Sequence, residues 1–133
     1  MPTRLKDPFE EVKKKFKEND LAEIWRRMKA EGLGVLQQEH GAKARQNLEK
    51  QFDKGLGPLL DQWAREAGDP VRTPRSDRER THDQVRWTIA SYRSSIKGFG
   101  WGGRAPMVLD GTLKHLDEEL ERQVEWYREA GLW

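Results

Sequence analysis

The sequence predicts an all-α protein: a small bundle of about five or six helices that ends in a helical hairpin joined by a glycine- and aromatic-rich loop. Two observations carry this prediction. Apolar residues recur at steps of three and four, which is the spacing of one helix face. Glycines, prolines and one Asn-Asp pair interrupt these segments at short intervals. A chain of 133 residues without cysteine is expected to form one domain with no disulfide.

Three parts are expected along the chain: an N-terminal helical part (1–67), a Pro/Arg-rich linker (68–80) and the hairpin (81–133). Two prolines and mixed charges mark the linker as irregular. It either separates the helical parts or forms an arm that reaches a neighbour.

The first helix is expected to start at Asp7-Pro8, with aspartate as the cap and proline at the first position. Asn19-Asp20 shifts the apolar register, so a second helix is expected from Leu21 to about Gly32. The first helix carries Lys13, Lys14, Lys15 and Lys17. We interpret them as a solvated face; contact with phosphate or anionic lipid is the alternative.

A longer helix is expected over 35–54 and a short one over 59–67, separated by a break at Gly55–Pro58 and ended by Gly68. His40 falls on the apolar row of the longer helix, which favours a packed histidine over a ligand.

The hairpin has the clearest periodicity. The apolar face of its first helix holds Val85, Ile89, Tyr92 and Ile96. A capping box at Thr81 and a left-handed terminator at Gly98 would bound it. Alternation of Val85, Trp87 and Ile89 could instead mark a short strand, but the helical pattern runs longer. The second helix has a stripe of Leu109, Leu113, Leu116, Leu120, Val124 and Tyr127, closed by Gly131.

The loop between these helices, residues 98–106, has four glycines yet also holds Phe99, Trp101 and Arg104. Flat rings and a guanidinium suit a partner protein or stacked bases. The alternative is a corner whose rings fold back onto the core. Trp126 and Trp133 near the chain end either pack in the core or dock onto a neighbour.

Composition favours an interaction protein. Leu, Ile, Val and Phe total 26 of 133 residues, near the level typical of disorder, but six tryptophans and a net charge of only +2 argue for folding. Charged residues make up 36% of the chain, which leaves each helix only a narrow apolar face. Such faces would complete their burial against another subunit. The sequence therefore predicts a non-enzymatic assembly or adaptor protein, a subunit of a larger cellular or viral (phage structural) particle. Its partner is a protein or a second copy.

Charge is unevenly spread: residues 71–104 hold 8 basic and 3 acidic side chains, whereas 105–133 hold 3 and 7. The two parts could pair within one subunit or between neighbours. The alternative function is nucleic-acid binding through the basic 72–104 segment. Its contacts would be Arg72, Arg75, Arg78, Arg80, Arg86, Arg93, Lys97 and Arg104.

Arg75 and His82 have six residues between them. This spacing loosely resembles the Arg…His motif of HEPN-type ribonucleases, which are helical bundles with an active site at a dimer interface. The resemblance implies that Arg75 would hold the scissile phosphate and that His82 would transfer protons. Pro74 and the linker composition place Arg75 before the helix.

No cofactor or metal is expected. Gly98-x-Gly100-x-x-Gly103 matches a dinucleotide fingerprint, but a helix rather than a strand precedes it. His115 with Glu118 and Glu119 gives too few ligands for a stable metal site. No signal peptide or membrane span is visible in the sequence. We therefore expect no membrane partner, and we expect a cytoplasmic or virion location.

Overall fold

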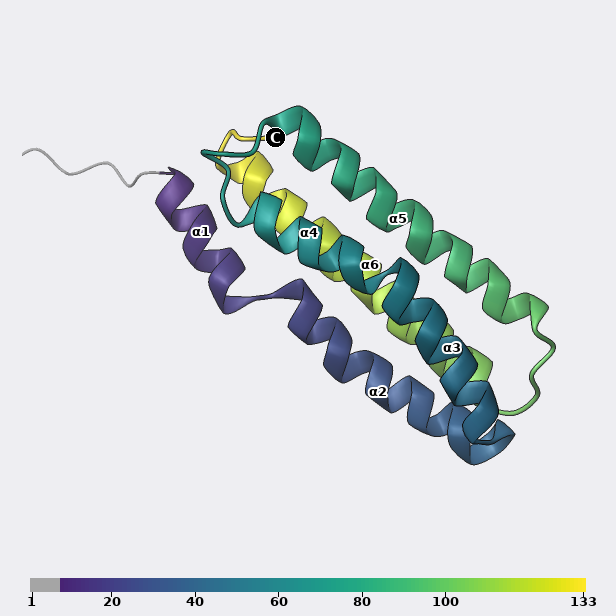
Figure 1. Ribbon diagram of the computed structural model, residues 1–133. Helices are drawn as coiled ribbons and strands as arrows, with labels where there is room; N and C mark the ends of the chain where they lie inside the picture. The colour runs from purple at the N-terminus through teal and green to yellow at the C-terminus, as the bar shows by residue number, and fades with distance from the viewer. Residues whose placement is uncertain (1–7) are drawn as a thin grey trace, which may run out of the picture.

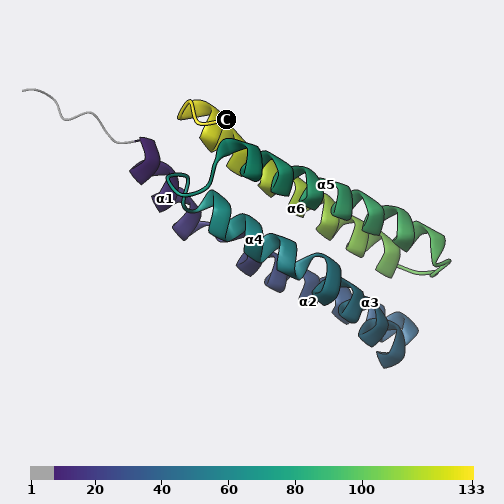
Figure 2. The same ribbon diagram turned by 45° about the horizontal axis from the view of Figure 1, so that its top comes forward.

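The computed structural model describes residues 8–133, and these fold into six helices and no strand. The helices are α1 (Pro8–Glu18), α2 (Leu21–His40), α3 (Ala42–Gly55), α4 (Gly57–Ala67), α5 (Arg75–Gly98) and α6 (Ala105–Glu129). They form four rods, because α1 leads into α2 and α3 into α4 with only short joints. The rods run alternately up and down (Figures 1 and 2), which confirms the predicted all-α bundle with a C-terminal hairpin.

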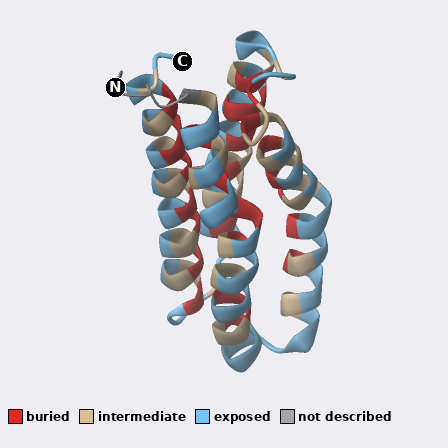
Figure 3. Ribbon diagram, turned by 90° about the vertical axis from the view of Figure 1, so that its left-hand side faces the viewer, coloured by how far each residue is buried: buried red, intermediate tan, exposed pale blue. Residues whose placement is uncertain are grey.

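The rods close into a ring. The α2 rod packs against both the α3–α4 rod and α6, while α5 lies between α4 and α6. Buried residues line the inward faces of all the rods (Figure 3). The α2–α6 contact is close at Gly32, where a Cβ would lie 2.9 Å from Leu109 Cδ2. This close approach joins the first part of the chain to the last.

A buried polar link ties three rods together. The indole Nε1 of Trp63 on α4 donates to Gln123 Oε1 on α6 at 2.7 Å, and Gln123 Nε2 donates to the Asn19 carbonyl at 2.7 Å. Asn19 sits in the joint between α1 and α2. Asp20 caps α2, since its carboxylate accepts from the Ala22 amide at 3.0 Å. The Asp7 cap expected for α1 lies outside the described residues.

The helix end predicted near Gly32 was wrong, because this glycine lies inside α2 and serves packing. The α2 helix continues through Gly32 to His40, and the break lies at Gly41, whose φ of +92° suits glycine. The predicted helix over 35–54 is therefore two helices. The break predicted at Gly55–Pro58 is confirmed: α3 ends at Gly55, where a Cβ would collide with the Tyr92 hydroxyl, and the joint falls at Leu56.

The start of α5 was also predicted wrongly. It begins at Arg75 rather than Thr81, so the last six residues of the predicted linker are helical and Thr81 is buried within the helix. Opposite charges at helical spacing stabilise this added turn and a half: Arg75 pairs with Glu79 and Arg80 with Asp77.

The ends of the hairpin helices differ in how well they were predicted. Gly98 stays helical, so it is not the left-handed terminator; the positive φ falls at Gly100. The expected end of α6 is confirmed. Gly131 has φ +73°, and the Leu132 amide donates back to the Tyr127 carbonyl at 2.8 Å.

Candidate functional site

The loop between α5 and α6 is held in place by the last two residues of α2. The Glu39 carboxylate accepts from the backbone amides of Arg104 at 2.9 Å and Ala105 at 2.6 Å. These amides belong to the start of α6, where N–H groups have no partner within the helix. The hydrogen bond from Arg104, supported by the one from Ala105, lowers the pKa of Glu39. Glu39 therefore acts as a cap supplied from another helix.

His40 completes this attachment. Its Nε2 lies 2.7 Å from the Gly102 carbonyl oxygen, and because a carbonyl only accepts, Nε2 carries the proton. The imidazole also stacks beside Trp101, with ring centroids 6.1 Å apart and planes 28° apart. The sequence favoured a packed histidine over a ligand; in the structure His40 is exposed at the end of α2, and it packs against the loop rather than against the core.

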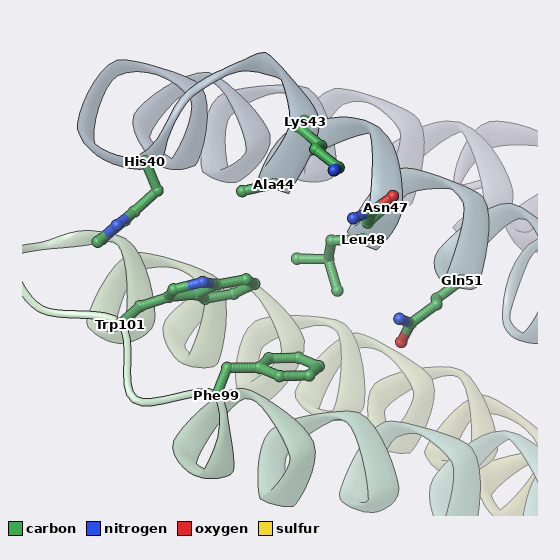
Figure 4. A pocket seen from close by; sticks show the side chains of 8 residues that line it. All are labelled: His40, Lys43, Ala44, Asn47, Leu48, Gln51, Phe99 and Trp101. Carbon is green, nitrogen blue, oxygen red and sulfur yellow. The ribbon is translucent and has the colours of Figure 1, made fainter.

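The loop and α3 enclose a slot of about 410 Å³. Figure 4 shows its two walls: the Phe99 and Trp101 rings on the loop side, and side chains that project from α3 on the other. The two rings touch, with centroids 4.7 Å apart, and Phe99 is 43% exposed. Leu48, 2% exposed, forms the floor. We call this feature the aromatic slot; it is lined by His40, Lys43, Ala44, Asn47, Leu48, Gln51, Phe99 and Trp101.

The lining defines what the aromatic slot can do. It offers apolar walls, two side-chain amides and one ammonium group, but no carboxylate, hydroxyl or thiol. Such a set can bind a flat or branched apolar group and orient it by hydrogen bonds. It supplies no nucleophile beyond an amine, and its only imidazole is occupied by the loop.

Of the other predicted interaction residues, none lines the slot. Arg104 lies beside it and contributes its backbone amide to Glu39. Trp126 packs edge-on against Phe16, with ring centroids 5.6 Å apart. Trp133 folds back onto Trp63, His82 and Tyr127. The structure thus brings together Phe99 and Trp101, and places both C-terminal tryptophans against the body of the chain.

Most basic side chains of residues 72–104 pair with groups of the same chain. Arg93 donates to Asp110 of α6 at 2.9 and 3.2 Å, and Arg86 lies 3.5 Å from both Asp117 and Glu121. The hydrogen bonds between Arg93 and Asp110 raise the pKa of Arg93 and lower that of Asp110. The basic and acidic halves of the hairpin therefore pair within one subunit.

Four further arginines of this segment also have partners within the chain. Arg78 is 4% exposed, donates to the Leu132 carbonyl at 3.1 Å and lies over the Tyr127 ring. Arg72, Arg75 and Arg80 pair with nearby carboxylates, and Lys97 is exposed with no ion pair among the described residues.

The Arg75–His82 pair does not form a shared site. Contrary to the expectation from Pro74, Arg75 is on the helix, where it pairs with Glu79 at 2.6 Å. His82 is 8% exposed, lies 2.8 Å from Glu121 and packs against Trp133. The imidazole is therefore engaged by Glu121 and partly covered by Trp133.

Sequence reasoning missed two features. The residues of the α3 wall were predicted to be helical but not to line a site. Asn47 and Gln51, one helical turn apart, were the available signal of a polar row. Trp87 was noted only within a strand-like alternation, yet it is 73% exposed. Its position two residues after Val85, about 200° around the helix, already placed it opposite the core face.

No group of three or more potential ligands for a metal occurs within residues 8–133. His115 lies 3.9 Å from Glu118 and from Glu119. In the same range, no helix has the length and apolar content to cross a membrane. Comparison of the chain with models of protein families, with curated proteins and with solved structures finds no match.

Proposed function

We propose that this chain is a non-enzymatic assembly or adaptor protein, of the kind that forms a subunit of a larger cellular or viral particle, and that it holds its partner at the aromatic slot. The observation that carries the proposal is the fixed, open pair of rings. Phe99 remains 43% exposed although Glu39 and His40 anchor the loop around it.

Anchoring matters because glycine-rich loops lose much conformational entropy when they become ordered. Here the folded chain already orders the loop, so an incoming side chain meets a preformed site. Aromatic residues in such pockets commonly provide most of the binding energy of a protein interface. A nucleic-acid role has less support, because most arginines of residues 72–104 are paired or buried within the chain.

Two measurements test the proposal. Light scattering after size-exclusion chromatography reports self-association of the full chain. Heteronuclear NMR with N-acetyl-phenylalaninamide reports occupancy of the slot by an apolar side chain. We expect the amide to shift the Trp101 indole signal and the side-chain amide signals of Asn47 and Gln51.

Phe99→Ala should abolish these shifts, and Trp101→Ala should abolish those of the Asn47 and Gln51 side-chain amides. Both variants should weaken any self-association, while circular dichroism shows unchanged helicity. Trp87→Ala is the matched control, because it removes an exposed tryptophan outside the slot. The proposal is rejected if the amide causes no shift at the slot and the Trp101 variant associates as the unmodified chain does.

A further inference from the structure

One face of α3 beside the aromatic slot carries three parallel rows of different chemistry. At 100° per residue, Lys43, Lys50 and Lys54 fall within about 20° of one line along the helix. Asn47 and Gln51 form the next row, and Ala44 with Leu48 the row that faces the rings. Figure 4 shows the second and third rows projecting from α3 toward the slot, with Lys43 beside them.

The lysine row is exposed and unpaired. Lys43, Lys50 and Lys54 make no ion pair or hydrogen bond with any described residue. The acidic residues of α3 are already engaged, since Glu49 lies 3.5 Å from Arg45 and Asp53 lies 2.7 Å from Lys29. The face therefore presents three free positive charges beside an apolar slot that contains no carboxylate.

From this arrangement we infer, on the basis of the function proposed above, that the slot binds an extended acidic segment of a partner protein. One large apolar side chain of that segment occupies the space between Leu48 and the Phe99–Trp101 rings. Its carboxylates lie along the lysine row, and its backbone contacts the amides of Asn47 and Gln51.

Spacing supports an extended peptide. Asn47 and Gln51 are separated by about 6 Å along the helix axis. Alternate residues of an extended chain repeat at about 6.6 Å. A side-chain amide can donate and accept, so each of the two can pair with a backbone carbonyl or N–H of such a segment.

Composition favours a peptide over a nucleic-acid strand. A strand brings a base with every phosphate, so three phosphates along the lysine row would bring three bases, whereas the slot presents a single pair of rings that contact each other. An acidic peptide brings carboxylates without additional rings.

The test uses the full chain and fluorescein-labelled, end-blocked peptides. The acidic peptide is Glu-Asp-Phe-Asp-Glu, and its neutral counterpart is Gln-Asn-Phe-Asn-Gln. Fluorescence anisotropy at low salt measures both affinities. We expect the acidic peptide to bind more tightly by about fivefold, the effect of two exposed ion pairs. The Lys50→Gln/Lys54→Gln double variant should remove this difference, whereas Lys114→Gln, an exposed lysine of α6, should preserve it.

Other outcomes separate this inference from the proposed function. Equal binding of both peptides, lost in Trp101→Ala, would overturn the acidic partner but leave the slot as a docking site. Tighter binding of a thymidine decamer, weakened by the same lysine changes, would replace the peptide with a nucleic acid. Binding of no peptide would overturn the inference, and the N-acetyl-phenylalaninamide experiment would then judge the proposed function by itself.

Discussion

Glu39 shows how one side chain can determine the shape of a distant loop. Its carboxylate joins the last turn of α2 to the first turn of α6, and Gly103 leaves room for it: a Cβ there would lie 2.6 Å from Glu39 Oε2. The positive φ of Gly103, +80°, is a second reason for glycine at this position. The Phe99–Trp101 wall of the slot depends on this contact.

Glu39 should make stability depend on pH in a defined direction. Because its pKa is lower in the folded chain, its contribution is complete above the ordinary glutamate pKa of about 4.3 and is lost as the pH falls through the lowered value. Glu39→Gln should therefore be less stable than the unmodified chain at pH 7 and should lose less stability on acidification.

Urea unfolding between pH 3 and pH 7 measures this effect. Glu31→Gln on the same helix is the matched control, since Glu31 is exposed and makes no ion pair or hydrogen bond with a described residue. Parallel pH profiles for Glu39→Gln and the unmodified chain would show that Glu39 does not hold the loop.

At the scale of elements, glycine was the residue whose role the sequence did not reveal. Gly41 breaks a helix, whereas Gly32 lies inside α2 and Gly55 ends α3, and at both of these a side chain of a distant helix, Leu109 or Tyr92, comes close. The sequence alone does not distinguish a glycine that breaks a helix from one that allows close packing, since the approaching side chain comes from another part of the chain. Apolar stripes were more informative: they predicted α6 and the joint at Asn19-Asp20.

Two glycines near the end of α2 should respond oppositely to alanine. Gly34 is helical and a Cβ there would meet nothing within 4 Å, so Gly34→Ala should stabilise the chain by about 0.5–1 kcal/mol. Gly41 has φ +92° and ψ 170°, so Gly41→Ala should destabilise it by about 1–3 kcal/mol. Urea unfolding of both variants checks the pair, and changes of the same sign would contradict the placement of the α2–α3 corner.

The candidate site was predictable only in part, because its walls come from segments that lie far apart in the sequence. Phe99 and Trp101 stood out because a glycine-rich loop seldom carries two large rings. Their neighbours on α3 were ordinary polar helix residues, and Glu39 and His40 precede the loop by some 60 residues. Contacts between segments so far apart leave no local pattern in a single sequence.

At the scale of the whole molecule, the buried hydrogen bonds of Gln123 connect parts that share no sequence neighbourhood. Gln123 is 1% exposed and Trp63 is fully buried. One side chain thereby satisfies the Trp63 indole and the carbonyl of Asn19 in the α1–α2 joint.

Gln123→Leu keeps a similar volume but removes both hydrogen bonds. It should destabilise the chain by about 1–3 kcal/mol, because the buried Trp63 indole is left unpaired. Urea unfolding at pH 7 measures the loss, with Gln84→Leu, an exposed glutamine of α5, as the control. Equal stability of the two variants would mean that the link contributes nothing beyond its packing.

The contact between Gly32 and Leu109 also has a consequence for synthesis on the ribosome. The apolar side of α2 leaves the ribosome early, but α6, one of the helices that pack against it, is made only after α3, α4 and α5. Until α6 is made, the face of α2 that packs against it lacks this cover. Completion of α6 closes the ring, so folding of the whole chain should finish in one late step rather than hairpin by hairpin.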